Sequence, residues 1–266
     1  MAIEYDSIRV ERTSPIWRVV LNRPEVKNAH DLHMFEEILM AFDEAEKNDD
    51  CRCVVLTGEG DFFSAGQDLR FTRSADAKSI DAYGRANVAA RQRIQRNFKP
   101  VVAAVNGPAI GGGVYLATAC DLIVAVDTSY FQMREIQAGN HSGGQNLFAI
   151  GRARSLEMAL LGRRIPAEKA EHWGLINACV PREEFAAAVA DYAEALAALP
   201  PLAVRYTKQA TNILLDSAGF SAHLESSGVM QRYLALTPDG REAKIAFHER
   251  RQPRFTGAYP KAVDPS

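Results

Sequence analysis

The chain has 266 residues, of which 47% are hydrophobic and 24% charged, values that allow one large globular core. A net charge of -2 without a long basic stretch argues against nucleic acid as a main partner. No apolar run is long enough to cross a bilayer, the N-terminus lacks a signal-peptide core, and no Cys/His spacing is typical of zinc sites. We therefore expect a reducing, cytoplasmic setting, no membrane partner, no metal site, and three buried free thiols among the four cysteines.

Short apolar runs alternate with segments of helical periodicity through the first half of the chain. The pattern predicts strands at 16–21, 53–56, 101–105 and 122–126, and helices at 31–47, 75–97 and 114–120, with Asp31 as the first N-cap. A glycine-containing loop or strand edge is expected at 62–69, and Asn106-Gly107-Pro108 predicts a turn. This alternation favours an α/β fold whose strands are buried on both faces.

The chain becomes mainly helical from about residue 155. Pro166 predicts the start of a helix that ends near Gly174, Pro181 begins another, and 203–216 forms a third. The last strand-like run is 176–180. Because no low-complexity linker separates these helices from the rest, we expect them to pack on the α/β part or on a neighbouring subunit.

Two glycine-containing segments carry the chemistry, namely 63–69 and 106–113. Gly111-Gly112-Gly113 lie between a turn and a helix, where small residues leave backbone N–H groups uncovered and the helix dipole favours negative charge. With a further N–H from the first segment, two donors could hold a developing oxyanion. The same glycines could equally serve only close helix–strand packing, and neither phosphate-binding glycine pattern is present.

Taken in order, these motifs resemble the crotonase superfamily of enoyl-CoA hydratases and isomerases. The similar segments are Leu21-Asn22-Arg23-Pro24 with Asn28-Ala29, the segments 63–69 and 104–107 with Gly111-Gly112-Gly113, Cys120-Asp121-Leu122-Ile123, Gly174-Leu175-Ile176-Asn177, and Ala246-Phe247 with Glu249-Arg250-Arg251. Each is weak alone, but the ordered set runs from about residue 8 to 257 and is specific.

The resemblance implies an α/β spiral of stacked ββα units at 1–200, followed by a mainly helical region at 201–266 that supports trimerisation and covers the active site. It implies a homotrimer, or a hexamer built as a dimer of trimers. The substrate would be an acyl-CoA, with coenzyme A as part of the thioester and no permanently bound cofactor.

The family's site residues can be placed one by one on this sequence. The oxyanion donors would be the N–H groups of Gln67 and Gly112. Residues expected along the substrate and coenzyme A are Pro24, Val26, Lys27, Ala29, Ala65, Gly66, Asp68, Leu69, Gly111, Gly139 and Asn140. Lys27 and Arg70 could meet the phosphates of coenzyme A, or be solvated surface charges.

The sequence departs from the two glutamates that the family's hydratases place around one water. One position holds Tyr115, a poor base at neutral pH unless strongly perturbed, and only Glu135 remains. Tyr115 could donate a proton or simply form the wall of the pocket. His141, in a glycine-rich stretch that is a few residues short, is a third catalytic candidate or an ordinary exposed histidine.

We therefore expect an enoyl-CoA hydratase or isomerase in which Glu135 transfers the proton and two amides stabilise a thioester enolate. One alternative is a thioester hydrolase, C–C bond hydrolase or decarboxylase of the same superfamily that uses Tyr115 or His141. Another is a non-catalytic acyl-CoA binding protein, which the loss of one carboxylate would fit.

Overall fold

Parallel strands form the main sheet of the computed structural model, which describes residues 4–74 and 76–259. Within that part of the chain the six-stranded sheet has the order β1-β2-β3-β4-β6-β9, and only β1 runs antiparallel to its neighbour. Its strands are β1 (Ile8–Thr13), β2 (Ile16–Leu21), β3 (Cys53–Gly58), β4 (Val101–Val105), β6 (Leu122–Val126) and β9 (Ala178–Val180). A smaller sheet has the order β5-β7-β8 and consists of β5 (Ala109–Ile110), β7 (Tyr130–Gln132) and β8 (Ile165–Pro166).

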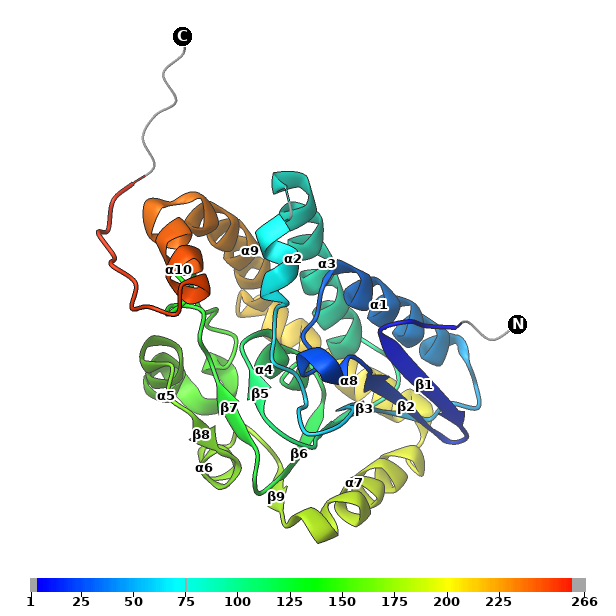
Figure 1. The fold of residues 1–266 in the computed structure, drawn as a ribbon. Coiled ribbons are helices and arrows are strands. Elements are labelled where there is room, and N and C mark those ends of the chain that lie inside the picture. Colours follow the sequence, from blue (N-terminus) through cyan, green and yellow to red (C-terminus); the bar gives the residue numbers. More distant parts are fainter. Residues whose placement is uncertain (1–3, 75, 260–266) are drawn as a thin grey trace.

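Helices cover the large sheet and continue beyond it (Figure 1). In chain order they are η1 (Pro24–Val26, a 3-10 turn), α1 (Leu32–Lys47), α2 (Leu69–Ser74), α3 (Ala77–Gln95), α4 (Gly112–Ala117), α5 (Leu147–Leu161), α6 (Ala167–Trp173), α7 (Arg182–Ala197), α8 (Pro201–Ser217), α9 (Phe220–Leu236) and α10 (Pro238–His248). No single helix in the described ranges is long and apolar enough to span a membrane, and only α7 with α8, bent by 101°, passes such a test as a pair.

The strands are apolar throughout because both faces of the sheet are covered. Successive side chains of a strand point to opposite faces. Val54 and Leu56 of β3 join the main core with the aromatic residues of α1, whereas Val55 joins a second cluster under α7, which contributes Val189. Each face therefore has its own helix layer, and β3 and β4 are buried along their whole length.

Most expected elements are confirmed. Asp31 caps α1 by accepting a hydrogen bond from the Met34 amide at 3.0 Å, and α3 matches the helix expected from Ala75, a residue outside the described ranges. All four cysteines are free, and three are buried. The helix expected at 114–120 instead begins at Gly112 and ends at Ala117.

The pattern missed β1 and the small sheet. The strands of the small sheet have only two or three residues each, too few to show a period. The small sheet nonetheless positions the candidate site, because β5 pairs in parallel with β7 and brings the residues after both strands together.

Asn28 ties together the chain segments that support the first glycine loop. It is fully buried, and its φ of 54° lies in the left-handed region that asparagine tolerates. Its side chain donates hydrogen bonds to the carbonyls of Glu59 and Phe62, both at 2.8 Å, and accepts one from the Arg23 amide at 3.0 Å.

We expect Asn28→Ala to lower the free energy of unfolding by about 3 kcal/mol, because three hydrogen-bonding groups lose their buried partner. Denaturant unfolding at fixed protein concentration measures the change. Asn48→Ala, which removes one exposed local hydrogen bond, is the matched control. Equal stability of the two variants would contradict this role for Asn28.

Candidate active site

Two glycine loops approach each other closely enough that side chains would not fit between them. A Cβ added to Gly66, where φ is +85°, would lie 2.5 Å from the carbonyl oxygen of Ile110. A Cβ added to Gly113 would lie 2.5 Å from the carbonyl oxygen of Ser64. The Ile110 amide donates to that same Ser64 oxygen at 2.9 Å and joins the two loops. Glycine is therefore required at both positions.

The two amides expected to bind an oxyanion lie in these loops. Gln67 forms a parallel bridge with His30 in which the flanking groups make the hydrogen bonds, so its own N–H points away from His30. The Gly112 nitrogen lies 3.1 Å from the place where a Cβ on Gly66 would be, which brings the two amides close together. Neither N–H donates to a backbone carbonyl among the residues the structure describes. Such a pair could polarise one carbonyl oxygen.

Glu135 lies directly beside these amides. It follows β7, whose partner β5 precedes Gly111, and a Cβ on Gly111 would lie 3.1 Å from Glu135 Oε1. The residue as a whole is half-buried, but Oε2 is inaccessible to solvent and has no hydrogen-bond partner among the described residues. Burial raises the pKa of Glu135 to about 7, against backbone hydrogen bonds and the charge of Arg91, which lower it. A carboxyl group with this pKa can both accept and release a proton near neutral pH.

Tyr115 is buried on α4, one helical turn after Gly112. Its hydroxyl accepts a hydrogen bond from the Gly143 amide at 2.7 Å and lies 3.3 Å from Ser142 Oγ. Burial raises the pKa of Tyr115 above its usual range, and the neighbouring Glu135 raises it further. The phenol is therefore un-ionised at neutral pH, and it holds the segment of Ser142 and Gly143 in place.

A histidine–tyrosine pair that sequence reasoning passed over lies on the other side of Gly112. His30 is fully buried, its Nδ1 lies 3.0 Å from the Tyr83 hydroxyl, and its ring packs on Phe35. Its Nε2 is buried without a partner in the described part of the chain, at the place where a Cβ on Gly112 would be. Burial lowers the pKa of His30 to about 4, so the ring is neutral at pH 7.

Arg91 is the second residue that the sequence reasoning missed. It lies on α3 and is only 8% exposed, with its guanidinium 5.1 Å from the centre of the Tyr115 ring. The sequence did contain a pattern that could have identified Arg91. Tyr83, Ala90 and Ile94 recur at helical spacing and mark the buried face of α3, and Arg91 lies beside that face. A cation on an apolar helix face is the kind of exception that points to a site.

His141 is directed toward α9. Its Nε2 lies 2.8 Å from the Ser227 carbonyl oxygen, and His223 of the same helix accepts a hydrogen bond from the Gly144 amide at 3.0 Å. These contacts hold the 139–146 stretch against α9, and a Cβ on Gly139 would lie 2.9 Å from the Asp239 carbonyl of α10. The structure thus brings Gln67, Gly112, Glu135 and Tyr115 together, and gives His141 contacts with α9 instead.

The segment expected along coenzyme A folds back on the first loop. Lys27 lies over the Phe62 ring at 4.9 Å, and the Ala65 amide donates to the Lys27 carbonyl at 2.9 Å. Asp68 accepts hydrogen bonds from Arg23 at 3.0 Å and from Arg70 at 2.9 Å, so it orients the loop. Leu69 is 39% exposed.

Two other features lie apart from these loops. Oxygen and nitrogen atoms of Asp6, His33 and Glu37 lie within 4.8 Å of one another, but Glu37 already accepts from two backbone amides at 2.6 and 2.8 Å.

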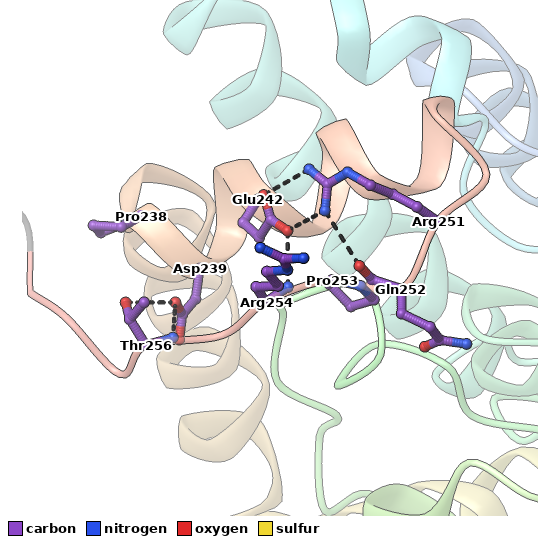
Figure 2. A pocket seen from close by; sticks show the side chains of 8 residues that line it. All are labelled: Pro238, Asp239, Glu242, Arg251, Gln252, Pro253, Arg254 and Thr256. Atoms are coloured by element: carbon purple, nitrogen blue, oxygen red, sulfur yellow. Dashed lines mark hydrogen bonds and ion pairs between the residues drawn. The ribbon is translucent and has the colours of Figure 1, made fainter.

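A surface hollow of about 670 Å³ is lined by α10 and the segment after it (Figure 2). Two of its charged side chains, Arg251 and Glu242, pair with each other at 3.0 Å.

Comparisons with known proteins identify the family to which this fold belongs. The family model for enoyl-CoA hydratase/isomerase matches residues 11–258. A probable enoyl-CoA hydratase of Mycobacterium bovis is 32% identical over 95% of this chain and 98% of its own length. The crystal structure of an enoyl-CoA hydratase from Mycobacterium avium subsp. paratuberculosis has a TM-score of 0.82 at 31% identity, over 95% of this chain and all of that one. That of an enoyl-CoA hydratase/isomerase from Xanthobacter autotrophicus has a TM-score of 0.84 at 30% identity, over 94% and 100%.

The chain therefore belongs to the enoyl-CoA hydratase/isomerase family and has the crotonase fold. The family resemblance and the α/β fold class predicted from the sequence are confirmed.

The raised pKa of Glu135 makes the stability of the protein depend on pH. The folded state holds this proton more tightly than the unfolded state, so stability is lost as pH rises from the ordinary 4.5 to about 7. Glu135→Gln stays neutral and should be more stable than the wild type by roughly 3 kcal/mol above pH 7, with no difference below about pH 4.5. Parallel denaturation curves across this range measure the difference. A constant offset at every pH would mean that burial does not shift this group.

Proposed function

We propose that the protein is an acyl-CoA isomerase of the crotonase type, which moves a double bond by proton transfer at a thioester enolate. The observation that carries this proposal is the arrangement of one carboxyl group, Glu135, beside the Gln67 and Gly112 amides. The sequence resemblance adds that Tyr115 stands at the position expected for a second carboxylate. One carboxyl group is sufficient to take a proton from one carbon and return it to another.

The mechanism follows from these groups. The two amides donate hydrogen bonds to the thioester carbonyl oxygen and stabilise the negative charge that develops on it. Ionised Glu135 removes a proton from the carbon next to the carbonyl of a 3-enoyl thioester. The electron pair forms the enolate, and the double bond shifts as protonated Glu135 returns the same proton at the fourth carbon. The product is the conjugated 2-enoyl thioester.

Hydration is the second candidate, and the printed names of the relatives favour it. Hydration needs one group to activate water and another to protonate carbon. Tyr115 is a weak candidate for the first role, because its pKa is raised above the usual range by burial and its hydroxyl already accepts the Gly143 amide. This occupied hydroxyl makes isomerisation the better-supported reaction.

Turnover of a 3-enoyl thioester and of a 2-enoyl thioester distinguishes isomerisation from hydration. We expect the wild type to convert trans-3-hexenoyl-CoA to the conjugated thioester, seen as a rise in absorbance. Glu135→Gln should lower the rate by about 100-fold or more, because the proton carrier is lost. Tyr115→Phe keeps the wall of the site and should stay within about tenfold of the wild type.

Crotonyl-CoA is the matching hydration substrate. Its rapid consumption by the wild type, abolished in Tyr115→Phe, would overturn the isomerase proposal in favour of a hydratase that uses the tyrosine. If coenzyme A thioesters bind but none reacts, the protein is a binder and not an enzyme.

We further propose that residues from 201 onward mediate assembly into a trimer or a dimer of trimers. Helices α8 to α10 expose many large apolar side chains, more than an isolated chain usually leaves in water. They include Leu202, Tyr206, Ile213, Leu214, Val229, Met230, Tyr233, Leu236, Ile245 and Phe247, each at least 47% exposed.

Leu214→Glu should lower the assembled mass measured by sedimentation or light scattering, because a charge replaces a residue that is 72% exposed in the single chain. Met40→Glu, on α1 and 43% exposed, is the control and should leave the mass unchanged. A monomeric wild type would contradict the assembly proposal.

A further inference from the structure

Arg91 differs from the other arginines of α3. Arg85 pairs with Asp81 at 2.6 Å, and Arg93 pairs with Glu46 at 2.9 Å. Arg91 is the buried one, at 8% exposure, yet it has no carboxylate within 4.0 Å among the described residues. A buried cation normally has a charged partner, because taking it out of water is costly.

The contacts that Arg91 does make are with neutral groups. Its Nη1 donates to Gln145 Oε1 at 2.7 Å, and its Nε donates to the Asn87 carbonyl at 3.4 Å. Its Cζ atom lies 5.1 Å from the centre of the Tyr115 ring. These bonds use two of the five N–H groups of a guanidinium. The contacts fix the position of the cation and leave its charge unneutralised.

The surroundings place this charge in the candidate site, beside the Tyr115 ring. Burial is the main influence on the neighbouring pKa values, and the charge of Arg91 contributes to those of His30, Tyr83, Tyr115, Glu135 and His223. Glu135 is the one acid in this set, and burial raises its pKa to about 7, so it neutralises Arg91 only in part. The other four side chains are neutral at pH 7, since burial lowers the pKa of both histidines and raises that of both tyrosines.

We propose that Arg91 binds a carboxylate on the acyl group, so that the preferred substrate is the thioester of a dicarboxylic acid. This inference rests on the proposed function, because the amides of Gln67 and Gly112 hold the thioester end while Arg91 takes the other. A carboxylate matches the planar fork of a guanidinium and can accept two parallel hydrogen bonds. It would supply the counter-charge that the protein itself does not place beside this residue.

The test measures binding of saturated thioesters, which cannot react. Calorimetry compares succinyl-, glutaryl- and adipyl-CoA with butanoyl-, pentanoyl- and hexanoyl-CoA, pairs of equal length that differ in the terminal carboxylate. We expect the wild type to bind at least one dicarboxylic thioester about tenfold or more tightly than its partner, as a buried hydrogen-bonded charge pair implies.

Variants assign the preference to this residue. Arg91→Gln should abolish the preference and still bind the neutral thioesters within about threefold of the wild type. Arg91→Lys keeps a positive charge and should retain part of the preference. Arg85→Gln, which removes an exposed cation from the same helix, should leave it unchanged.

Two outcomes overturn the inference, and they are distinct. Equal affinity for both members of every pair in the wild type, or an undiminished preference in Arg91→Gln, would refute the carboxylate site. Either result would leave the proposed function unaffected. Failure of every thioester to bind would refute the proposed function and, with it, this inference.

Discussion

The close approach of two glycine loops is the constraint on which the rest of this site depends. Gly66 and Gly113 allow backbone to contact backbone across the gap, where a single Cβ would lie 2.5 Å from a carbonyl oxygen. This proximity is what brings the Gln67 and Gly112 amides together. Because the loops follow strands of two different sheets, the packing of those sheets sets the spacing between the two donors.

Charge is distributed in the site in an unusual way. One carboxyl group and one guanidinium are buried with neutral aromatic and imidazole groups around them, and no ion pair joins the two within 4.0 Å. In a low-dielectric setting, each charge then shifts its neighbours' proton affinities more than it would in water. Burial raises the pKa of Glu135 to about 7 although the Arg91 charge lowers it, and burial also keeps Tyr115 un-ionised.

Tyr115 has a structural role in addition to the chemical role considered for it. The phenol accepts the Gly143 amide, and Gln145 of the same loop accepts from Arg91. His141 and Gly144 add contacts to α9. A glycine-rich loop has little conformational preference of its own, so these tertiary hydrogen bonds define its path beside Tyr115 and Arg91.

The sequence alone determined the family and the strand–helix alternation, and it predicted the two amide loops and Glu135 as parts of the site. These features are local, since glycine spacing, capping by Asp31 and apolar runs act over a few residues. The small sheet was not predicted because its strands are too short to show an alternating pattern of apolar residues. Only the tertiary structure showed that His30, Tyr83 and Arg91 share one buried site with Glu135, because these residues come from segments far apart in the chain. The spacing of Tyr83, Ala90 and Ile94 indicates which face of α3 turns inward, but which charge on that face lacks a carboxylate depends on long-range packing.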